Sequence, residues 1–310
     1  MSDYHLAAEA QAALEPGLST RRLLLRRFLR HRLAVGSLIF LLLLGAAVAG
    51  APLVEGWLGF GPDDVDLFNR SSGPSAKHPL GTDELGRDLL LRLLYGGQVS
   101  LLVGLAAAVG AMALGSLIGI FAGYRGGWTD SFLMRLTDGV IALPILPLLI
   151  VFAAIDPGKL GLPAGGGSDV LRIVVIIVLV GWTTVARMVR GAALSLKQQE
   201  FVRAAEALGA SPWRIMSRHI LPNCASPILV ATTLSVGNII LLESVLSFLG
   251  LGIQPPLPSW GNMLTGAQDL IYSAPQLAVW PGLLIFLTVI AFNFLGDGLQ
   301  DALDPKARNL

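Results

Sequence analysis

Six runs of apolar residues dominate the chain, and shorter polar segments separate them. The runs cover residues 33–54, 97–123, 131–155, 170–192, 224–249 and 276–298. A helix of about 20 apolar residues crosses a hydrocarbon core of about 30 Å, so each run predicts a membrane-spanning helix. The pattern therefore predicts an all-α polytopic membrane protein with six transmembrane helices.

Proline interrupts three of these predicted helices. Pro144 and Pro147 lie in the third run, and Pro227 and Pro281 lie near the starts of the fifth and the sixth. Proline is tolerated in membrane helices where neighbouring groups satisfy the freed carbonyls. We therefore expect kinks at these positions. The kinks either serve a transport path or are ordinary irregularities of helix packing.

The composition agrees with a membrane protein and narrows its chemistry. The chain is 54% hydrophobic and 14% charged, whereas soluble domains carry about 25% charged residues. The net charge of +1 argues against nucleic-acid binding. Cys224 is the single cysteine, which excludes an intrachain disulfide framework and a cysteine-rich metal site.

Lys and Arg are distributed unevenly between the two predicted sides of the membrane. Sixteen fall on one side, and six (Arg70, Lys77, Arg87, Arg92, Lys159 and Arg172) fall on the other. The sixteen are Arg21, Arg22, Arg26, Arg27, Arg30, Arg32, Arg125, Arg135, Arg187, Arg190, Lys197, Arg203, Arg214, Arg218, Lys306 and Arg308. Because positive charge favours the cytoplasmic side, both termini and the loop 193–223 are expected there, with loops 55–96 and 250–275 outside.

The expected organisation follows from these spans and their orientation. It comprises a basic cytoplasmic tail 1–32, a first transmembrane helix 33–54, an external loop 55–96, a five-helix core 97–298 and a cytoplasmic tail 299–310. Residues 21–50 also fit a signal peptide loosely, but the apolar region of a signal peptide usually has about 7–15 residues. The first run has about 22, so a retained helix is expected.

Residues 200–222 form a polar insert between the fourth and fifth runs. Residues 200–208 are helix formers, and Gly209 can take the left-handed conformation that ends a helix. Ser211 suits an N-cap and Pro212 suits the first helical position after it, while Pro222 is expected to stop this second helix. The insert therefore predicts two short helices at the membrane surface, with a shape suited to a partner's groove.

This insert resembles the "EAA" coupling loop of ABC-importer permeases. The matching residues are Ala204, Ala205, Gly209, Leu221 and Pro222. The insert departs from the motif at Arg203, where the motif usually has Glu, and at His219, where it has Ile.

A second motif lies in the external loop, at residues 78–98. Thr82 can cap a helix, and Asp83 and Glu84 favour its N-terminal end, so this stretch predicts an amphipathic helix before the second span. His78 near Asp83 and Asp88 suggests a metal site as one interpretation. No second His or Cys lies near, so a structural turn is favoured and no metal is expected. The stretch resembles the segment that precedes the core in dipeptide and oligopeptide permeases.

A third motif, residues 243–264, follows the fifth span. Gly250 and Gly252, together with three prolines, predict a rigid non-helical connector. Trp260 is expected at the membrane interface. This segment also resembles the dipeptide and oligopeptide permeases.

The second span carries Gly115, Gly119 and Gly123 at four-residue spacing. Small residues at this spacing let two helices approach closely. The spacing fits a homodimer, a heterodimer or an internal contact equally well.

Two acidic residues lie within the predicted spans. Asp138 stands in the third span, three residues after Arg135, which can pair with it. Glu243 stands late in the fifth span, near the outer surface. Charged groups inside membranes are functional hypotheses, so both residues are candidates for the translocation path or its gating, with a structural role as the alternative.

The motifs of enzymes are missing from the sequence. Gly158-Lys159 lacks the rest of a phosphate-binding loop, and there is no His-Glu-x-x-His zinc motif. An intramembrane aspartyl protease needs two close carboxylates, but Asp297 lies at the cytoplasmic exit of the last span and Asp138 is flanked by Arg135. We therefore expect a transport subunit rather than an enzyme.

The resemblance implies the permease core of a type I ABC importer in a bacterial inner membrane. It further implies a heterodimer with a homologous permease, two cytoplasmic ATPases that use ATP and Mg, and an external solute-binding protein that delivers peptides. This chain would itself bind no cofactor. The residues implied in ATPase coupling are Glu200, Arg203, Ala204, Ala205, Glu206, Leu208 and Gly209.

Other readings of the same residues stay open. The same motifs occur in importers of nickel and glutathione. An ion-coupled secondary transporter should show an inverted repeat and broken midplane helices, neither of which is seen in the sequence. A membrane enzyme is the remaining alternative of a different class.

Overall fold

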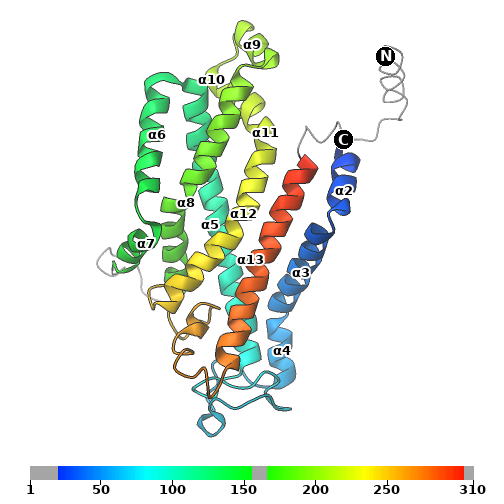
Figure 1. Cartoon of the computed structure of the whole chain (residues 1–310), viewed down its shortest axis with the longest axis vertical. Coiled ribbons are helices and arrows are strands. Elements are labelled where there is room, and N and C mark those ends of the chain that lie inside the picture. The colour runs from blue at the N-terminus through cyan, green and yellow to red at the C-terminus, as the bar shows by residue number, and fades with distance from the viewer. Residues whose placement is uncertain (1–19, 156–165, 304–310) are drawn as a thin grey trace.

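The computed structural model describes residues 20–155 and 166–303, and within these ranges the chain is helical without a β-strand (Figure 1). The predicted tails 1–32 and 299–310 therefore lie partly outside the described residues. The α-helices are α2 Thr20–Arg30, α3 Arg32–Ala49, α4 Ala51–Leu58, α5 Leu89–Arg125, α6 Gly127–Ala142, α7 Ile145–Ala153, α8 Gly166–Lys197, α9 Glu200–Ala207, α10 Pro212–Ile215, α11 Leu221–Asn223, α12 Ala225–Phe248 and α13 Gln276–Leu303. Short 3₁₀ or π segments are η1 Leu67–Asn69, η3 Met216–Ile220 and η4 Asn262–Leu264.

Five of the described helices are long and apolar enough to cross a membrane, namely α3, α5, α8, α12 and α13. Helices α6 and α7 together have the length and composition of a sixth span, but they meet at 86°. Five of the six predicted runs therefore correspond to a membrane-length helix and the third to the bent pair α6 and α7, and the fold class is confirmed.

The break between α6 and α7 arises from the proline at the junction. Leu143 ends α6 with an extended backbone at φ −77° and ψ 137°, and Pro144 follows as the N-cap of α7. The residue before a proline is disfavoured in the helical region, so the helix stops there. By contrast, Pro281 lies within α13, which runs through it as one helix.

Helices α5 and α8 form the centre of the bundle, packed almost backbone to backbone. A Cβ atom placed on Gly115 would lie 2.6 Å from the Trp182 carbonyl oxygen, and one on Gly119 would lie 2.6 Å from the Ala186 carbonyl oxygen. One on Gly123 would lie 2.8 Å from the Ala193 Cβ. The glycine spacing allowed a homodimer, a heterodimer or an internal contact, and the structure shows the internal one. Only glycine fits at these three positions, because any side chain would overlap α8.

The remaining helices surround this pair. Helix α12 packs against α5 and α13, and α3 packs along α13. Figure 1 shows α2 and α3 at one edge of the bundle and α6 and α7 at the opposite edge. Helix α9 and the C-terminal end of α13 lie toward one end of the molecule, and the loop between α4 and α5 lies at the other.

Trp260 does not lie at the membrane interface as predicted. Its side chain is fully buried, and its Nε1 donates a hydrogen bond to the Leu93 carbonyl oxygen. The connector between α12 and α13 is non-helical at this point, as expected, but it folds back over the start of α5 and carries the indole inward. Burial leaves no polar group of the indole unpaired, because its N–H bonds the Leu93 carbonyl oxygen.

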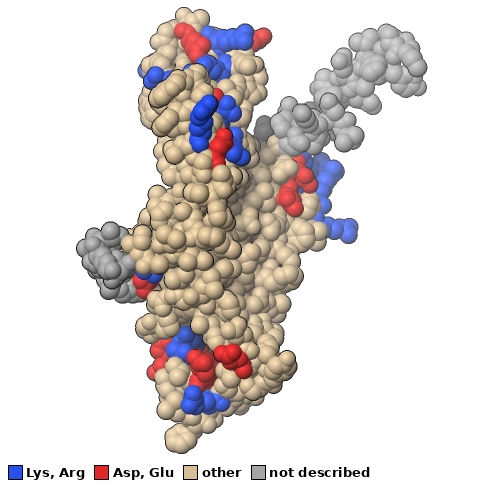
Figure 2. Space-filling model, turned by 60° about the vertical axis from the view of Figure 1, so that its left-hand side comes forward, with Lys and Arg blue, Asp and Glu red and all other residues tan. Residues whose placement is uncertain are grey.

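Charged side chains are confined to particular parts of the surface. On the face shown in Figure 2, most Lys, Arg, Asp and Glu gather toward the two ends of the described structure, and the belt between them is uncharged except for one small patch at its edge. This distribution suits a protein that crosses a hydrocarbon layer.

Candidate functional site

Helix α9 is amphipathic, with one side packed on the bundle and the other exposed. Val202 is fully buried and packs with Ile215 and Val189, whereas the Leu208 side chain that follows the helix is 89% exposed. Ala204 is exposed, but Ala205 is half-buried and packs against the same cluster. The exposed side of α9 that could enter a partner's groove is therefore narrower than expected, because the Ala205 side chain lies partly against the bundle.

The turn after α9 has the predicted geometry. Gly209 has φ +80°, in the left-handed region, and its N–H bonds the Glu206 carbonyl oxygen at 3.0 Å. The Ala210 N–H bonds the Ala205 carbonyl oxygen at 3.0 Å, which closes the helix end. The Ser211 hydroxyl then accepts a hydrogen bond from the Arg214 N–H and caps α10.

Pro222 does not stop the second helix as predicted. Helical backbone continues from α10 through η3 and α11 to the start of α12. The π segment η3 makes this continuation possible, since the Leu221 N–H bonds the Met216 carbonyl oxygen, five residues back. Pro222 then falls in the first turn of α11, directly after this π segment.

One polar contact ties α9 to the end of α5, and a second ties the end of α8 to the same tyrosine. The Tyr124 hydroxyl donates to the Glu206 carboxylate at 3.2 Å, and the Lys197 Nζ donates to the Tyr124 carbonyl oxygen at 2.7 Å. The Lys197 ammonium also stands over the Tyr124 ring, 5.3 Å from its centroid. Sequence analysis missed Tyr124, although a tyrosine at the end of a long apolar run is the signal that could have identified it.

These contacts separate the predicted coupling residues into two groups. Glu206 is exposed but bonded to Tyr124 of α5, whereas among the described residues no side-chain bond to the bundle is seen for Glu200 and Arg203, which are exposed with Ala204. The outward surface of α9 therefore presents Glu200, Arg203, Ala204 and Leu208, and we call these four residues the α9 face.

Two ion pairs join α6 to α8. The Arg190 guanidinium donates to both carboxylate oxygens of Asp130, at 2.5 and 2.6 Å, and Arg187 Nη2 donates to Asp138 Oδ1 at 2.5 Å. The predicted pairing of Asp138 with Arg135 is therefore wrong. Arg187 reaches Asp138 from the neighbouring helix, a proximity that sequence spacing along one helix does not reveal.

Glu243 lies late in α12, as predicted, and its side chain is fully buried inside the bundle. Its carboxylate accepts hydrogen bonds from the Ser100 hydroxyl of α5 and from the Ser247 hydroxyl one turn later. The Ser100 hydroxyl in turn accepts a hydrogen bond from the backbone N–H of Trp260. These contacts join α5, α12 and the connector after α12, and the role of Glu243 in translocation stays a prediction.

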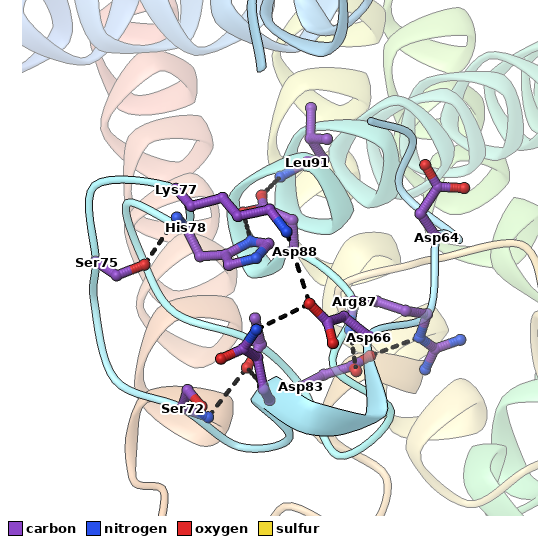
Figure 3. Close-up of polar contacts among 12 residues, drawn as sticks. Asp64, Asp66, Ser72, Ser75, Lys77, His78, Asp83, Arg87, Asp88 and Leu91 are labelled. Atoms are coloured by element: carbon purple, nitrogen blue, oxygen red, sulfur yellow. Dashed lines mark hydrogen bonds and ion pairs between the residues drawn. The ribbon is translucent and has the colours of Figure 1, made fainter. Parts of the chain in front are cut away.

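The outer loop folds as a compact turn instead of the predicted amphipathic helix (Figure 3). Helix α5 begins at Leu89, and Asp88 caps it by accepting from the Leu91 N–H at 2.8 Å. Asp83 Oδ1 accepts from the N–H groups of Leu85 and Arg87, which holds residues 83–87 in a loop. The sequence pattern failed here because Gly86 has φ +78°, a conformation that a helix excludes.

His78 is part of the same loop. Its Nδ1 lies 2.9 Å from Asp88 Oδ2, and the pair is nearly inaccessible to solvent (Figure 3). The Arg87 Nε donates to Asp83 Oδ2 at 2.7 Å. His78 therefore joins the loop to the residue that caps α5, in the manner of a structural turn.

Comparison with known proteins gives consistent matches along the chain. A family model described as "Binding-protein-dependent transport system inner membrane component" matches residues 115–309. A second model, described as "N-terminal TM domain of oligopeptide transport permease C", matches residues 19–74.

Individual relatives align over most of the chain. The glutathione transport system permease protein GsiD of Pectobacterium atrosepticum is 42% identical over 284 residues, covering 92% of this chain and 90% of the relative. The protein of the same name in Escherichia coli is 42% identical over 283 residues, covering 91% and 89%. The dipeptide transport system permease protein DppC of Alkalihalophilus pseudofirmus is 42% identical over 246 residues, covering 79% and 78%.

Proposed function

This chain belongs to the family of binding-protein-dependent transport system inner membrane components, and we propose that it translocates peptides of the dipeptide and oligopeptide class. It is a multi-pass permease subunit of an ABC importer, a system that also requires ATPase and binding-protein components. The relatives' names support the peptide class, since they specify dipeptides and glutathione, which is itself a short peptide. Glutathione is thus the second candidate substrate.

The α9 face is the proposed docking surface for one cytoplasmic ATPase. An exposed leucine beside a small alanine suits insertion into a groove of a partner, and Glu200 can contact basic residues at the rim of that groove. Closure of the ATPases on ATP and Mg would press on α9. Tyr124 and Lys197 would pass this displacement to α5 and so to the α5–α8 pair.

The proposed orientation places α9 and both termini in the cytoplasm and the outer loop outside. The excess of Lys and Arg on one side supports this orientation. It also fits Figure 1, where α2 and the end of α13 lie toward the α9 end of the molecule. The proposed assembly contains a homologous second permease, two ATPases and an external solute-binding protein, with ATP and Mg bound by the ATPases alone.

The single observation that carries the coupling proposal is the outward exposure of Ala204 and Leu208. Single cysteines at these positions, in a Cys224→Ala background, should crosslink to an ATPase subunit in the assembled complex. A cysteine at the half-buried Ala205 is the matched control and should crosslink more weakly. Equal labelling of Ala204→Cys by a water-soluble thiol reagent with and without bound ATPase would contradict the docking surface.

A further inference from the structure

The Asp138–Arg187 ion pair lies on an exposed surface, about three helical turns from the ends of α6 and α8 that lie nearest α9. Asp138 is eleven residues from the start of α6 and Arg187 is ten residues from the end of α8. At 1.5 Å per residue, each lies about 15 Å from the helix end nearest α9. Nevertheless their side chains are 60% and 48% exposed.

Lipid is an unfavourable neighbour for this pair. Charged groups inside membranes face the interior of the assembly or a water-filled cavity, because hydrocarbon cannot solvate them. An arginine can extend its long side chain toward the headgroups, but an aspartate carboxylate on its short stem cannot. The pair also differs from Asp130–Arg190, in which both carboxylate oxygens are already bonded and the Asp130 side chain is only 15% exposed.

The outward side of α8 changes character along its length. In the half nearest the external end, the exposed residues are apolar, as at Val175 and Leu179. In the half nearest α9 they are Thr184, Arg187, Gly191 and Ser195, which we call the polar stripe. Spacings of three, four and four residues place these on one side of a helix, so Arg187 belongs to a continuous polar surface.

We propose that the polar stripe and Asp138 form part of the wall of the aqueous translocation path, and that the Asp138–Arg187 pair contacts the charged termini of a passing peptide. This inference rests on the proposed function, because a peptide substrate has an ammonium and a carboxylate group at its ends. The contact between the two side chains uses Oδ1 of Asp138 and Nη2 of Arg187. The second carboxylate oxygen can accept from a peptide ammonium while other guanidinium N–H groups donate to a peptide carboxylate.

The first test measures which environment the surface faces in the assembled importer. Asp138→Cys, in the Cys224→Ala background, should react with a charged, membrane-impermeant thiosulfonate in inside-out membrane vesicles. The control is Leu136→Cys, because Leu136 is exposed on the same helix but lies away from the polar stripe. Binding protein loaded with alanyl-alanine and enclosed in the vesicle lumen, where the external face lies, should slow the reaction at position 138 only when a non-hydrolysable ATP analogue is added outside.

Two results of this test would overturn the inference. One is that position 138 reacts no faster than position 136, which indicates lipid or a permease partner covering the surface. The other is that the peptide-loaded system leaves the reaction rate at position 138 unchanged. This result indicates that the surface faces water but that the peptide does not contact it.

The second test separates contact with substrate from a tie between helices. Asp138→Asn and Arg187→Gln should each lower peptide uptake by about tenfold, the effect of losing a hydrogen bond to a charged group. The double variant Asp138→Arg with Arg187→Asp re-forms an ion pair with its charges reversed, and it should assemble normally but still transport slowly. Wild-type uptake in the double variant would mean that the pair only joins α6 to α8.

Transport by the wild-type protein tests the proposed function separately. If wild-type vesicles accumulate neither alanyl-alanine nor glutathione with all partners present, the peptide assignment fails. If the wild type transports peptide but the two variants behave as it does, only the inference about Asp138 and Arg187 fails.

Discussion

Replacing Gly209 tests the link between a single backbone angle and ATPase coupling. Gly209 has φ +80°, and a Cβ atom at this position would meet no other atom within 4 Å. The substitution therefore adds backbone strain without a clash. For an L-residue in the left-handed region this strain is about 1–2 kcal/mol, which lowers the population of the native turn by about 5- to 30-fold relative to competing conformations.

The expected order of substrate-stimulated ATPase activity follows from how well each residue tolerates this angle. Gly209→Asn should retain most of the activity, Gly209→Ala should lose much of it, and Gly209→Val should lose the most because its side chain is β-branched. The assay is ATP hydrolysis by purified complex in proteoliposomes, with and without peptide-loaded binding protein. Membrane levels of each variant should equal those of the wild type, since nothing crowds the new side chain.

Gly250 supplies a matched control at the opposite end of the molecule. It has φ +74° and equally open surroundings, so Gly250→Ala carries the same kind of backbone strain away from α9. We expect this variant to keep its ATPase stimulation. The reasoning is refuted if Gly209→Val is fully stimulated in an assembled complex, or if Gly250→Ala loses stimulation to the same extent.

Three further predictions concern topology, reactivity and packing. Reporter fusions after residues 65 and 260 should both indicate the external side, and a cytoplasmic signal at either would contradict the orientation. The Cys224 thiol is fully buried, so iodoacetamide should alkylate it much more slowly in the folded protein than after denaturation; rapid labelling of the folded protein would argue against burial. Gly119→Ala should lower thermal stability in detergent by about 1–3 kcal/mol because its Cβ would press on the Ala186 carbonyl oxygen, whereas Gly139→Ala, with open surroundings, should not.

The spans were predictable because their signal is summed over many residues. A run of about 20 apolar residues favours a membrane helix regardless of its neighbours, so five of the six runs correspond to single membrane-length helices, and only the third, with its prolines, is bent into α6 and α7. The turn at Gly209 was predictable for a different reason. Gly209, Ser211 and Pro212 each favour one local conformation, and the three preferences agree.

Features that depend on distant contacts were not predictable from local pattern. The leucines after Thr82 are spaced like the apolar side of a helix, but Gly86 has φ +78° and its backbone lies directly against the distant Asp66, where a helix cannot form. Trp260 is of a residue type common at membrane interfaces, yet its indole donates a hydrogen bond to Leu93, which is far away in the sequence. Likewise, nothing close to Asp138 in sequence identifies Arg187 as its partner.

The length of α5 has a consequence for how the protein meets membranes of different thickness. The helix has 37 residues and is about 55 Å long, whereas the hydrocarbon layer is about 30 Å thick. Its outer end, including Leu89, Leu91 and Gly97, is buried beneath protein such as Trp260 rather than exposed to lipid. Since the protein itself covers this excess length, hydrophobic mismatch exerts little force on the tilt of α5, and thin and thick bilayers should hold the α5–α8 pair at similar angles.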